Sequence, residues 1–313
     1  MTAATPQPRV SAPFTATRFG EETVTLAGVS RAYGGRLAVD GVDLTLRAGE
    51  GIGLVGHNGA GKSTLIKLML GLIDPSAGRL EVLGVRPGGR GAAASRARIG
   101  HLPENVSLSP SLTGVETLAF YARLKRLPVD ANAALLDRVG LIEARDRRVG
   151  TYSKGMRQRL GLAQAMLGRP RLMLLDEPTT GLDPELRQVF YEILGELRRD
   201  GATVLLSSHA LGELEGEVDR IVVMNRGRKV ADGSLGVLRE LAAMRPIIRL
   251  RRGDRDDHDW SGWTAGPGGL VEIECGEDAL TDRLRRLPPG VRDIEIIRPS
   301  LDDLYATFQR EAT

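Results

Sequence analysis

The chain contains the stretch Gly56-His57-Asn58-Gly59-Ala60-Gly61-Lys62-Ser63, which fits the nucleotide-phosphate loop G-x-x-x-x-G-K-[ST] at every fixed position. An apolar run at residues 51–55 precedes it and a helical pattern at residues 64–70 follows it, as this motif requires. Glycines let backbone N–H groups close around a polyphosphate, and the helix directs its partial positive end toward it. We therefore predict a nucleoside triphosphate site, in which Lys62 reaches the β- and γ-phosphates and the Ser63 hydroxyl ligates Mg²⁺.

Length, charge and cysteine content set the first limits. With 313 residues the chain exceeds the usual size of a single core, so we expect one large and one small domain. The formal net charge of +3 does not indicate a nucleic-acid partner. No window approaches the roughly 18 apolar residues of a membrane span, so any role at a membrane requires a partner chain. The single cysteine, Cys275, permits no internal disulfide, which fits a reducing compartment.

The pattern of apolar residues predicts an α/β protein in three parts. Residues 1–21 carry several Pro, Ser and Thr residues without an apolar core, and we expect a disordered N-terminal tail. Residues 22–242 contain the phosphate loop and are expected to form one nucleotide-binding domain. Residues 243–313 are expected to form a small C-terminal α+β domain.

Two kinds of strand are expected in residues 22–242. Alternation of apolar and polar residues predicts half-buried strands at residues 23–26 and 42–46. Continuous apolar runs predict central parallel strands at residues 172–175, 203–206 and 221–224. Helical spacing is found at residues 113–127, 131–139 and 184–199. This order of strands and helices predicts a parallel sheet with its ligand at the carboxyl ends of the strands.

The small domain has its own pattern. Strands are expected at residues 247–250, 270–273 and 293–297. Helices are expected at residues 279–287 and 301–310. The Gly- and Asp-rich residues 252–269 are expected to form a surface loop.

Two carboxylates close the apolar run at residues 172–175. Asp176, at the end of this strand, can hold Mg²⁺ opposite Ser63. Glu177 is one residue further on and points elsewhere, so it can polarise an attacking water molecule. By themselves the two residues are also compatible with surface acids that cap a strand, and it is the phosphate loop that makes the catalytic interpretation strong.

A second candidate anion site lies between these motifs. Ser153, Lys154 and Gly155 open a helical pattern, and the start of a helix presents free backbone N–H groups. Alone, this pattern also fits a helix that Ser153 caps.

The motifs in this order resemble the ATP-binding cassette (ABC) ATPases from about residue 22 to residue 242. The order comprises the phosphate loop, Leu102-Pro103-Glu104, the signature Ser153-Lys154-Gly155, Asp176-Glu177-Pro178-Thr179, Gly181-Leu182-Asp183 and Ser207-Ser208-His209. The resemblance implies a mixed sheet with helices, an antiparallel β subdomain and a helical subdomain. It also implies a homodimer of two cassettes packed head to tail, in which the signature of one covers the γ-phosphate held by the other.

The resemblance also implies roles for individual residues, with ATP as the nucleotide. The nucleotide would be held by Tyr33, which would stack on adenine, and by Gly56, His57, Asn58, Gly59, Ala60, Gly61, Lys62, Ser63 and Thr64. Ser63 and Asp176 would hold Mg²⁺. Glu177 would be the general base, His209 would contact the γ-phosphate, and Asp183 would lie at the dimer interface.

Three positions depart from the family pattern. Glu104 stands where the family usually has Gln; its carboxylate remains a hard oxygen ligand for Mg²⁺ but adds negative charge near the γ-phosphate. Lys154 replaces a usual glycine in the signature, and Met156 replaces a usual glycine or glutamine. Since Ser153 and Gly155 are retained, we expect activity to survive.

A narrower resemblance is to the NosF group, the ATPases of the transporter that matures the copper sites of bacterial nitrous oxide reductase. It rests on residues 56–59, 102–106 and 152–165, and above all on the tail at residues 293–305. It implies an integral membrane permease and a periplasmic repeat protein as partners, a copper or sulfur species as cargo, and a cytoplasmic location on the inner face of the membrane.

Two alternatives accompany this interpretation. The chain could be the ATPase of a general exporter of drugs, lipids or polysaccharide. It could also be a soluble cassette protein that acts on ribosomes or DNA, but such proteins usually carry two cassettes or long coiled coils. This chain has one cassette and no sustained heptads, which favours transport.

Overall fold

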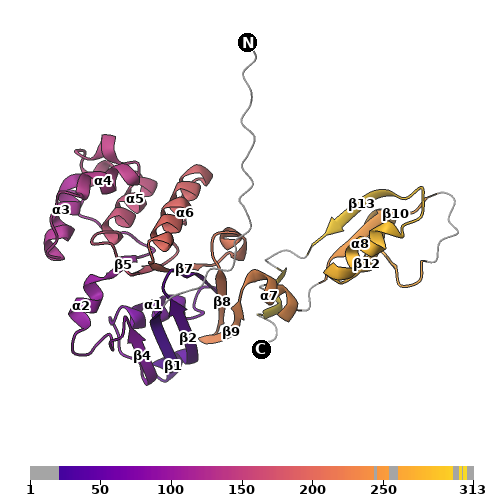
Figure 1. The fold of residues 1–313 in the computed structure, drawn as a ribbon, viewed down its shortest axis with the longest axis horizontal. Helices are drawn as coiled ribbons and strands as arrows, with labels where there is room; N and C mark the ends of the chain where they lie inside the picture. The colour runs from indigo at the N-terminus through magenta and orange to yellow at the C-terminus, as the bar shows by residue number, and fades with distance from the viewer. Residues whose placement is uncertain (1–20, 243–244, 254–259, 299–302, 305, 309–313) are drawn as a thin grey trace, which may run out of the picture.

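The computed structural model describes residues 21–242, 245–253, 260–298, 303–304 and 306–308. The expected N-terminal tail therefore lies outside the described residues, apart from Glu21. The described residues form three sheets, of six, three and four strands. Figure 1 shows the six- and three-stranded sheets on one side and the four-stranded sheet on the other.

The largest sheet has six strands and carries the phosphate loop. Its order is β5 (Ile99–Leu102), β6 (Leu172–Leu175), β7 (Thr203–Ser208), β3 (Gly51–Val55), β8 (Arg220–Asn225) and β9 (Arg228–Gly233). All pairs are parallel except β8 with β9. Every residue of β3, β6 and β7 is buried, because both faces of the sheet are covered. This confirms the expected parallel strands and the mixed sheet.

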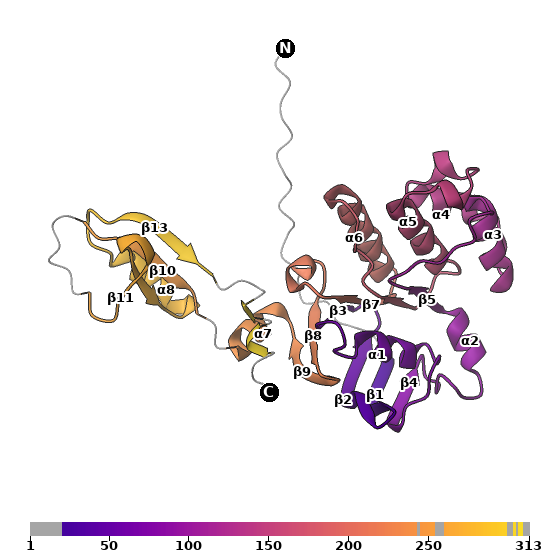
Figure 2. The same ribbon diagram turned by 180° about the vertical axis from the view of Figure 1, so that it is seen from behind.

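The second sheet is antiparallel and lies against the first helix. It contains β2 (Arg36–Arg47), β1 (Glu22–Tyr33) and β4 (Ala77–Val82), in that order. Its apolar side chains share one core with those of α1 (Lys62–Met69) and of the six-stranded sheet. Figure 2 shows α1 beside the strands of this sheet, seen from behind. The antiparallel β subdomain is thus confirmed. Strands β1 and β2 are longer than the ranges 23–26 and 42–46 that the alternation of apolar and polar residues predicted.

Three helices gather on the far side of β5. They are α3 (Gly114–Leu124), α4 (Asn132–Arg138) and α5 (Lys154–Ala165). A capping box begins α3, where Thr113 and Glu116 exchange hydrogen bonds. The long α6 (Pro184–Arg199) is capped by Asp183, whose side chain accepts a hydrogen bond from the backbone N–H of Leu186. Their buried faces and the sheet form a second core.

Sequence reasoning missed several short elements. Among these, β4 and β9 are edge strands with few apolar residues, so neither shows the hydrophobic pattern of a central strand. The short helices α2 (Ala92–Ala97) and α7 (Leu235–Leu241) were also not expected. The expected loop at residues 252–269 contains the two-residue strand β11 (Thr264–Ala265) and a 3₁₀ turn at Pro267–Gly269, and its residues 254–259 lie outside the described part.

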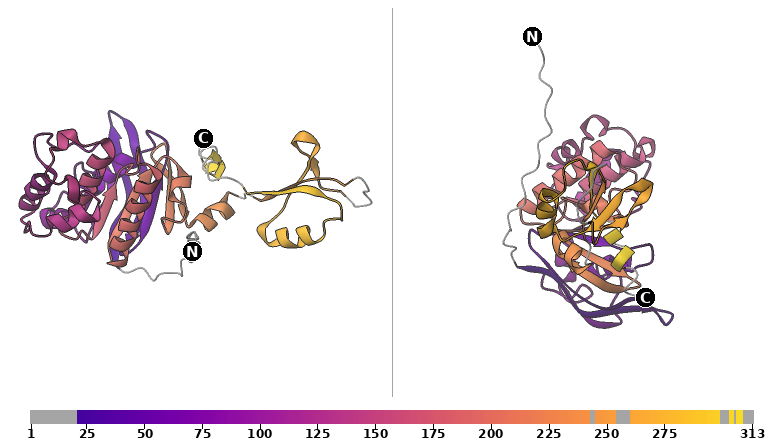
Figure 3. Two further views of the ribbon diagram at one scale, coloured as in Figure 1. Left: turned by 90° about the horizontal axis from the view of Figure 1, so that it is seen from above. Right: turned by 90° about the vertical axis from the view of Figure 1, so that its right-hand side faces the viewer.

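The third sheet comes entirely from the C-terminal part of the chain, residues 243–313, which we call the tail. Its order is β11, β12 (Val271–Glu274), β10 (Ile247–Arg251) and β13 (Arg292–Ile297), and α8 (Glu277–Arg285) follows β12. Ile248, Leu250 and Leu280 belong to its separate small core. Figure 3 shows this sheet standing apart from the six-stranded one.

Near its end the chain returns to the larger body. Of the helix expected at residues 301–310, the described residues 303–304 and 306–308 are helical. Leu304 and Phe308 are 1% and 4% exposed and belong to the core that also contains Leu238 of α7. The core of residues 22–242 therefore includes side chains from the end of the tail.

Candidate active site

The phosphate loop connects β3 to α1 and is shaped by close contacts. A Cβ atom on Gly61 would lie 2.5 Å from the carbonyl oxygen of Ala38, and its φ of +105° favours glycine. A Cβ atom on Gly56 would lie 2.8 Å from the carbonyl oxygen of Met224. Residues 56 and 61 must therefore be glycine, because strands β2 and β8 press on the loop from outside.

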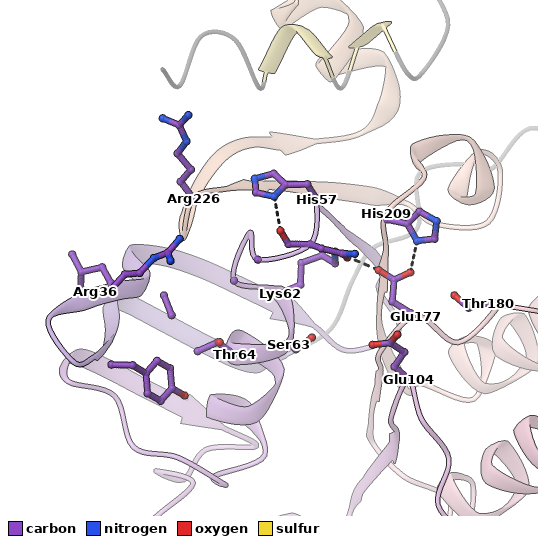
Figure 4. Close-up of a pocket in the computed structure, with 16 residues that line it drawn as sticks. Arg36, His57, Lys62, Ser63, Thr64, Glu104, Glu177, Thr180, His209 and Arg226 are labelled. Atoms are coloured by element: carbon purple, nitrogen blue, oxygen red, sulfur yellow. Dashed lines mark hydrogen bonds and ion pairs between the residues drawn. The ribbon is translucent and has the colours of Figure 1, made fainter.

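Lys62, Glu177 and His209 form a chain of charged groups beside the loop. The ammonium of Lys62 is 6% exposed, donates a hydrogen bond to the carbonyl oxygen of Gly56 and lies 3.3 Å from Glu177 Oε1. The other carboxylate oxygen of Glu177 lies 2.8 Å from His209 Nδ1. Figure 4 shows both contacts converging on Glu177. The sequence-predicted base and histidine thus meet at the phosphate lysine, although more than a hundred residues separate them from it.

Ser207 connects the two carboxylates at the end of β6. The backbone N–H of Glu177 donates to Ser207 Oγ at 2.9 Å, and this hydroxyl donates to Asp176 Oδ1 at 2.6 Å. Glu177 has a φ of +48°, a left-handed conformation that is uncommon for a residue other than glycine. Ser207 accepts a hydrogen bond from the strained residue and donates one to Asp176, and it therefore holds this strained turn in place.

His101 stands next to Asp176 on the neighbouring strand β5. Burial lowers the pKa of this imidazole below 6.5, and the negative charge of Asp176 opposes the shift. The imidazole therefore stays neutral at neutral pH, and Asp176 gains no cationic partner from it.

One large cavity gathers most of the predicted nucleotide residues. Its volume is about 930 Å³, in the range of small-molecule sites. Its lining includes the predicted residues Tyr33, His57, Asn58, Gly59, Gly61, Lys62, Ser63, Thr64, Glu104, Glu177 and His209. It also includes residues that sequence reasoning did not single out, namely Arg36, Leu37, Ala38, Thr180 and Arg226. These residues lie at the start of β2 or in turns and carry no motif that would have identified them.

The signature residues stand away from this cavity. Ser153 caps α5 by accepting a hydrogen bond from the N–H of Met156, and Ser153 and Lys154 are exposed. The Lys154 ammonium covers Gly181, where a Cβ atom would lie 2.9 Å from Nζ. None of Ser153, Lys154 and Gly155 lines the cavity of their own chain. In the described part of one chain the signature and the phosphate loop are therefore separate surfaces.

The comparisons with known proteins agree with this geometry. Residues 39–180 match the family model described as ABC transporter. The Nod factor export ATP-binding protein I of Rhizobium meliloti is 41% identical over 293 residues, covering 90% of this chain and 86% of that protein. The chain belongs to the ABC transporter ATP-binding proteins. Its function as an ATPase follows from this family.

Two further relatives extend the comparison. The daunorubicin/doxorubicin resistance ATP-binding protein DrrA of Streptomyces peucetius is 39% identical over 302 residues, covering 90% of this chain and 91% of that protein. A solved structure described as the ATP binding subunit of an ABC transporter superposes with a TM-score of 0.66 at 31% identity, covering 71% of this chain and 93% of that one. ABC ATPase domains act as dimers with a membrane permease.

The helices of the described residues were compared with the length and hydropathy of a membrane span. None of their helices combines the length and the apolar character needed to cross a membrane.

Proposed function

We propose that this ABC transporter ATP-binding protein hydrolyses ATP to drive export of a drug, lipid or polysaccharide through a separate permease on the cytoplasmic face of the membrane. The observation that supports this proposal is the extent of the matches to the Nod factor and daunorubicin/doxorubicin proteins. Each match leaves about a tenth of this chain uncovered, which is shorter than residues 243–313. The similarity to these proteins therefore reaches into the tail, where cassette proteins differ most.

The geometry supports specific roles within one cassette. Lys62 keeps a donor for phosphate oxygens, since an ammonium has three N–H groups and Gly56 accepts one of them. Glu177 takes the proton of the attacking water as that water's oxygen bonds to the γ-phosphorus and the bond to the β-phosphate oxygen breaks. His209, held at 2.8 Å, positions the Glu177 carboxylate.

Hard oxygen donors that suit Mg²⁺ are present at the same place. Ser63 and Glu104 line the cavity, and Asp176 follows β6 with one carboxylate oxygen engaged by Ser207. When bound, the ion would neutralise charge on the β- and γ-phosphates. We assign Ser63, Asp176 and Glu104 as its candidate ligands.

A second copy of the chain completes this proposal. Ser153, Lys154 and Gly155 present the start of α5 on a surface away from their own cavity, so they can serve the cavity of a partner. Asp183, at the start of α6, lies near Lys154 through the loop at Gly181 and would belong to the same interface. The two-domain division at residue 242 is part of the proposal, with Leu304 and Phe308 fastening the tail to the cassette.

The second candidate is maturation of the copper sites of nitrous oxide reductase, with a periplasmic repeat protein as a further partner. It is favoured by the resemblance of residues 293–305 to the NosF group. That resemblance separates the maturation ATPases from exporter ATPases less well than we expected, because the matches to the exporter relatives also extend into the tail.

One pair of measurements separates the two candidates. In a host that lacks this gene, export predicts nitrous oxide reductase with full copper content, whereas maturation predicts apo or partly metallated enzyme. In inverted membrane vesicles, export predicts ATP-dependent uptake of daunorubicin that is lost with Glu177→Gln. Uptake that is equal in the wild type and the variant would contradict export of this probe.

A further inference from the structure

Glu213 contacts several segments around the catalytic pair, and the proposed function assigns no role to it. It lies in the short 3₁₀ helix Leu211–Leu214, four residues after His209. Its side chain is 25% exposed, and it is not among the residues that line the nucleotide cavity. An effect of Glu213 on the reaction must therefore pass through the residues that its carboxylate contacts.

The two oxygens of this carboxylate have partners in different segments. The hydroxyl of Thr179 donates a hydrogen bond to Oε2 at 3.2 Å, and the guanidinium of Arg187 lies 3.3 Å from Oε1. Ser208 Oγ lies 3.4 Å from Oε2, but it is closer, at 3.1 Å, to the carbonyl oxygen of Ala210. Because a hydroxyl has a single hydrogen to donate, Thr179 and Arg187 are the main partners of the Glu213 carboxylate.

Thr179 belongs to the strained turn that carries the proposed base. Residues 177–179 are each held by a side chain from another element. These side chains are Ser207 of β7, at the N–H of Glu177, Gln158 of α5, at the carbonyl oxygen of Pro178, and Glu213, at the hydroxyl of Thr179. Since Glu177 has a φ of +48°, such contacts maintain a backbone conformation that costs free energy. Glu213 provides the charged contact among the three.

On its other side Glu213 is attached to α6. Tyr191 lies one helical turn after Arg187, and its hydroxyl donates a hydrogen bond to the backbone carbonyl oxygen of Glu213 at 3.0 Å. Burial and the negative charge of Glu213 raise the pKa of Tyr191 above its usual value, so this hydroxyl stays protonated and remains a donor. Since Tyr191 is itself buried in the core, the position of Glu213 is fixed relative to the sheet.

An ordinary surface ion pair does not account for this arrangement. Glu215, two residues further on, is such a case, because its side chain is 53% exposed and its carboxylate lies 3.1 Å from the guanidinium of Arg239. Glu213 also binds Thr179, which is 3% exposed and lies two residues after Glu177. Its carboxylate therefore links the turn of the base to α6, which a pairing role alone would not require.

We propose that Glu213 is a positioning residue of the ATPase site, whose carboxylate holds the turn after Glu177 so that the Glu177–His209 pair keeps the geometry that receives the proton of the attacking water. Figure 4 shows this pair at the cavity, where the carboxylate of Glu177 and His209 Nδ1 are 2.8 Å apart. The proposal rests on the proposed role of Glu177 as the base and extends it to the residue that holds this base in place.

The test measures kcat and KM for ATP with the full-length protein. Glu213→Ala should lower kcat by about 10- to 100-fold, as the loss of a group that orients a reacting residue does. KM should change by less than about twofold, because the phosphate loop is untouched. Glu215→Ala, at the exposed carboxylate two residues further on, is the matched control and should keep both wild-type values.

Two double variants separate positioning from a general effect on folding. Thr179→Val breaks the same contact without altering Glu213, so it should lower kcat as well, and combining it with Glu213→Ala should bring no further loss. In the Glu177→Gln background, Glu213→Ala should not lower the residual turnover further, since no base is left to position. A misfolded fraction of the protein would instead lower turnover by the same factor in both backgrounds.

The outcomes distinguish this proposal from the proposed function. Wild-type kcat in Glu213→Ala, a change in KM alone, or an equal loss with and without the Glu177→Gln substitution would overturn the positioning role. Full turnover in Glu177→Gln would overturn the base itself and the positioning role with it. The expected loss in Glu177→Gln beside wild-type turnover in Glu213→Ala would leave the proposed function intact and overturn the positioning role alone.

Discussion

The cassette site and the tail sheet use charged residues in opposite ways. On the tail sheet, Arg249 lies 2.6 Å from Glu272 and 3.2 Å from Glu295, and Arg251 lies 2.8 Å from Asp293, so neighbouring strands exchange ion pairs. At the site, Glu177 is held in a left-handed turn against a buried lysine, and two arginines line the cavity. Paired charges on a regular surface indicate a structural role, whereas strained or buried charges mark the groups that act on a ligand.

The largest effect should come from a substitution of Glu177, at the cassette site. Replacing it with Gln keeps the size of the side chain but removes the base, so we expect kcat for ATP to fall by about 10²- to 10⁴-fold. Nucleotide affinity should be retained, because Lys62 and the backbone of the loop remain. Turnover and equilibrium binding of a fluorescent ATP analogue measure the two quantities.

The matched variant for this test is Lys62→Ala. It removes a phosphate contact rather than the base, so affinity itself should weaken. Full turnover in Glu177→Gln would show that another group accepts the proton.

The second prediction concerns the junction between the two regions. Phe308 is 4% exposed in the core that Leu238 and Leu214 also occupy. Phe308→Ala should leave a cavity there and cost up to about 3–5 kcal/mol of stability, measured by denaturant unfolding. Ile294→Ala, at a residue of β13 that is 49% exposed, is the control and should cost far less. Equal losses in the two variants would contradict the docking of the chain end against the cassette.

Sequence reasoning was most accurate where one strong local signal decides the structure. The buried runs of β3 and β6 were predicted with the observed bounds, as was α6, which has a capping Asp183 and a proline in its first turn. The meeting of Lys62, Glu177 and His209 followed from a motif order that a known family shares.

The missed features depend on contacts between distant segments. Arg36 and Arg226 reach the cavity because the start of β2 lies against Gly61 and the β8–β9 turn is hydrogen-bonded to Ala60 of the phosphate loop. Ser207 acquires its role from the position of β7 beside β6. Periodicity in one segment carries no information on such neighbours, and the return of Phe308 to the cassette core is missed for the same reason.

A third prediction tests the structural character of the tail charges. Arg251 and Asp293 are 49% and 61% exposed, and solvent-exposed pairs of this kind contribute little to stability. Arg251→Ala should therefore leave kcat/KM for ATP unchanged and should shift Tm far less than Phe308→Ala. A loss of activity without a change in Tm would show that the tail sheet takes part in the ATPase cycle and would remove the contrast between the two regions.

The smallest effect should come from Glu217, an exposed carboxylate of the cassette that its neighbours partly desolvate. Burial raises its pKa above 4.5, Arg198 opposes the shift, and Glu192 adds to it. Between the unfolded and the raised folded pKa the native state binds more protons, so stability falls as pH rises through this window. Glu217→Gln should remove this slope and raise Tm slightly at pH 7. The control is Glu215→Gln, at an exposed carboxylate that has an ion pair with Arg239 at 3.1 Å, and it should bring no such gain. A stability that rises with pH through this window in the wild type but not in Glu217→Gln would contradict the assignment.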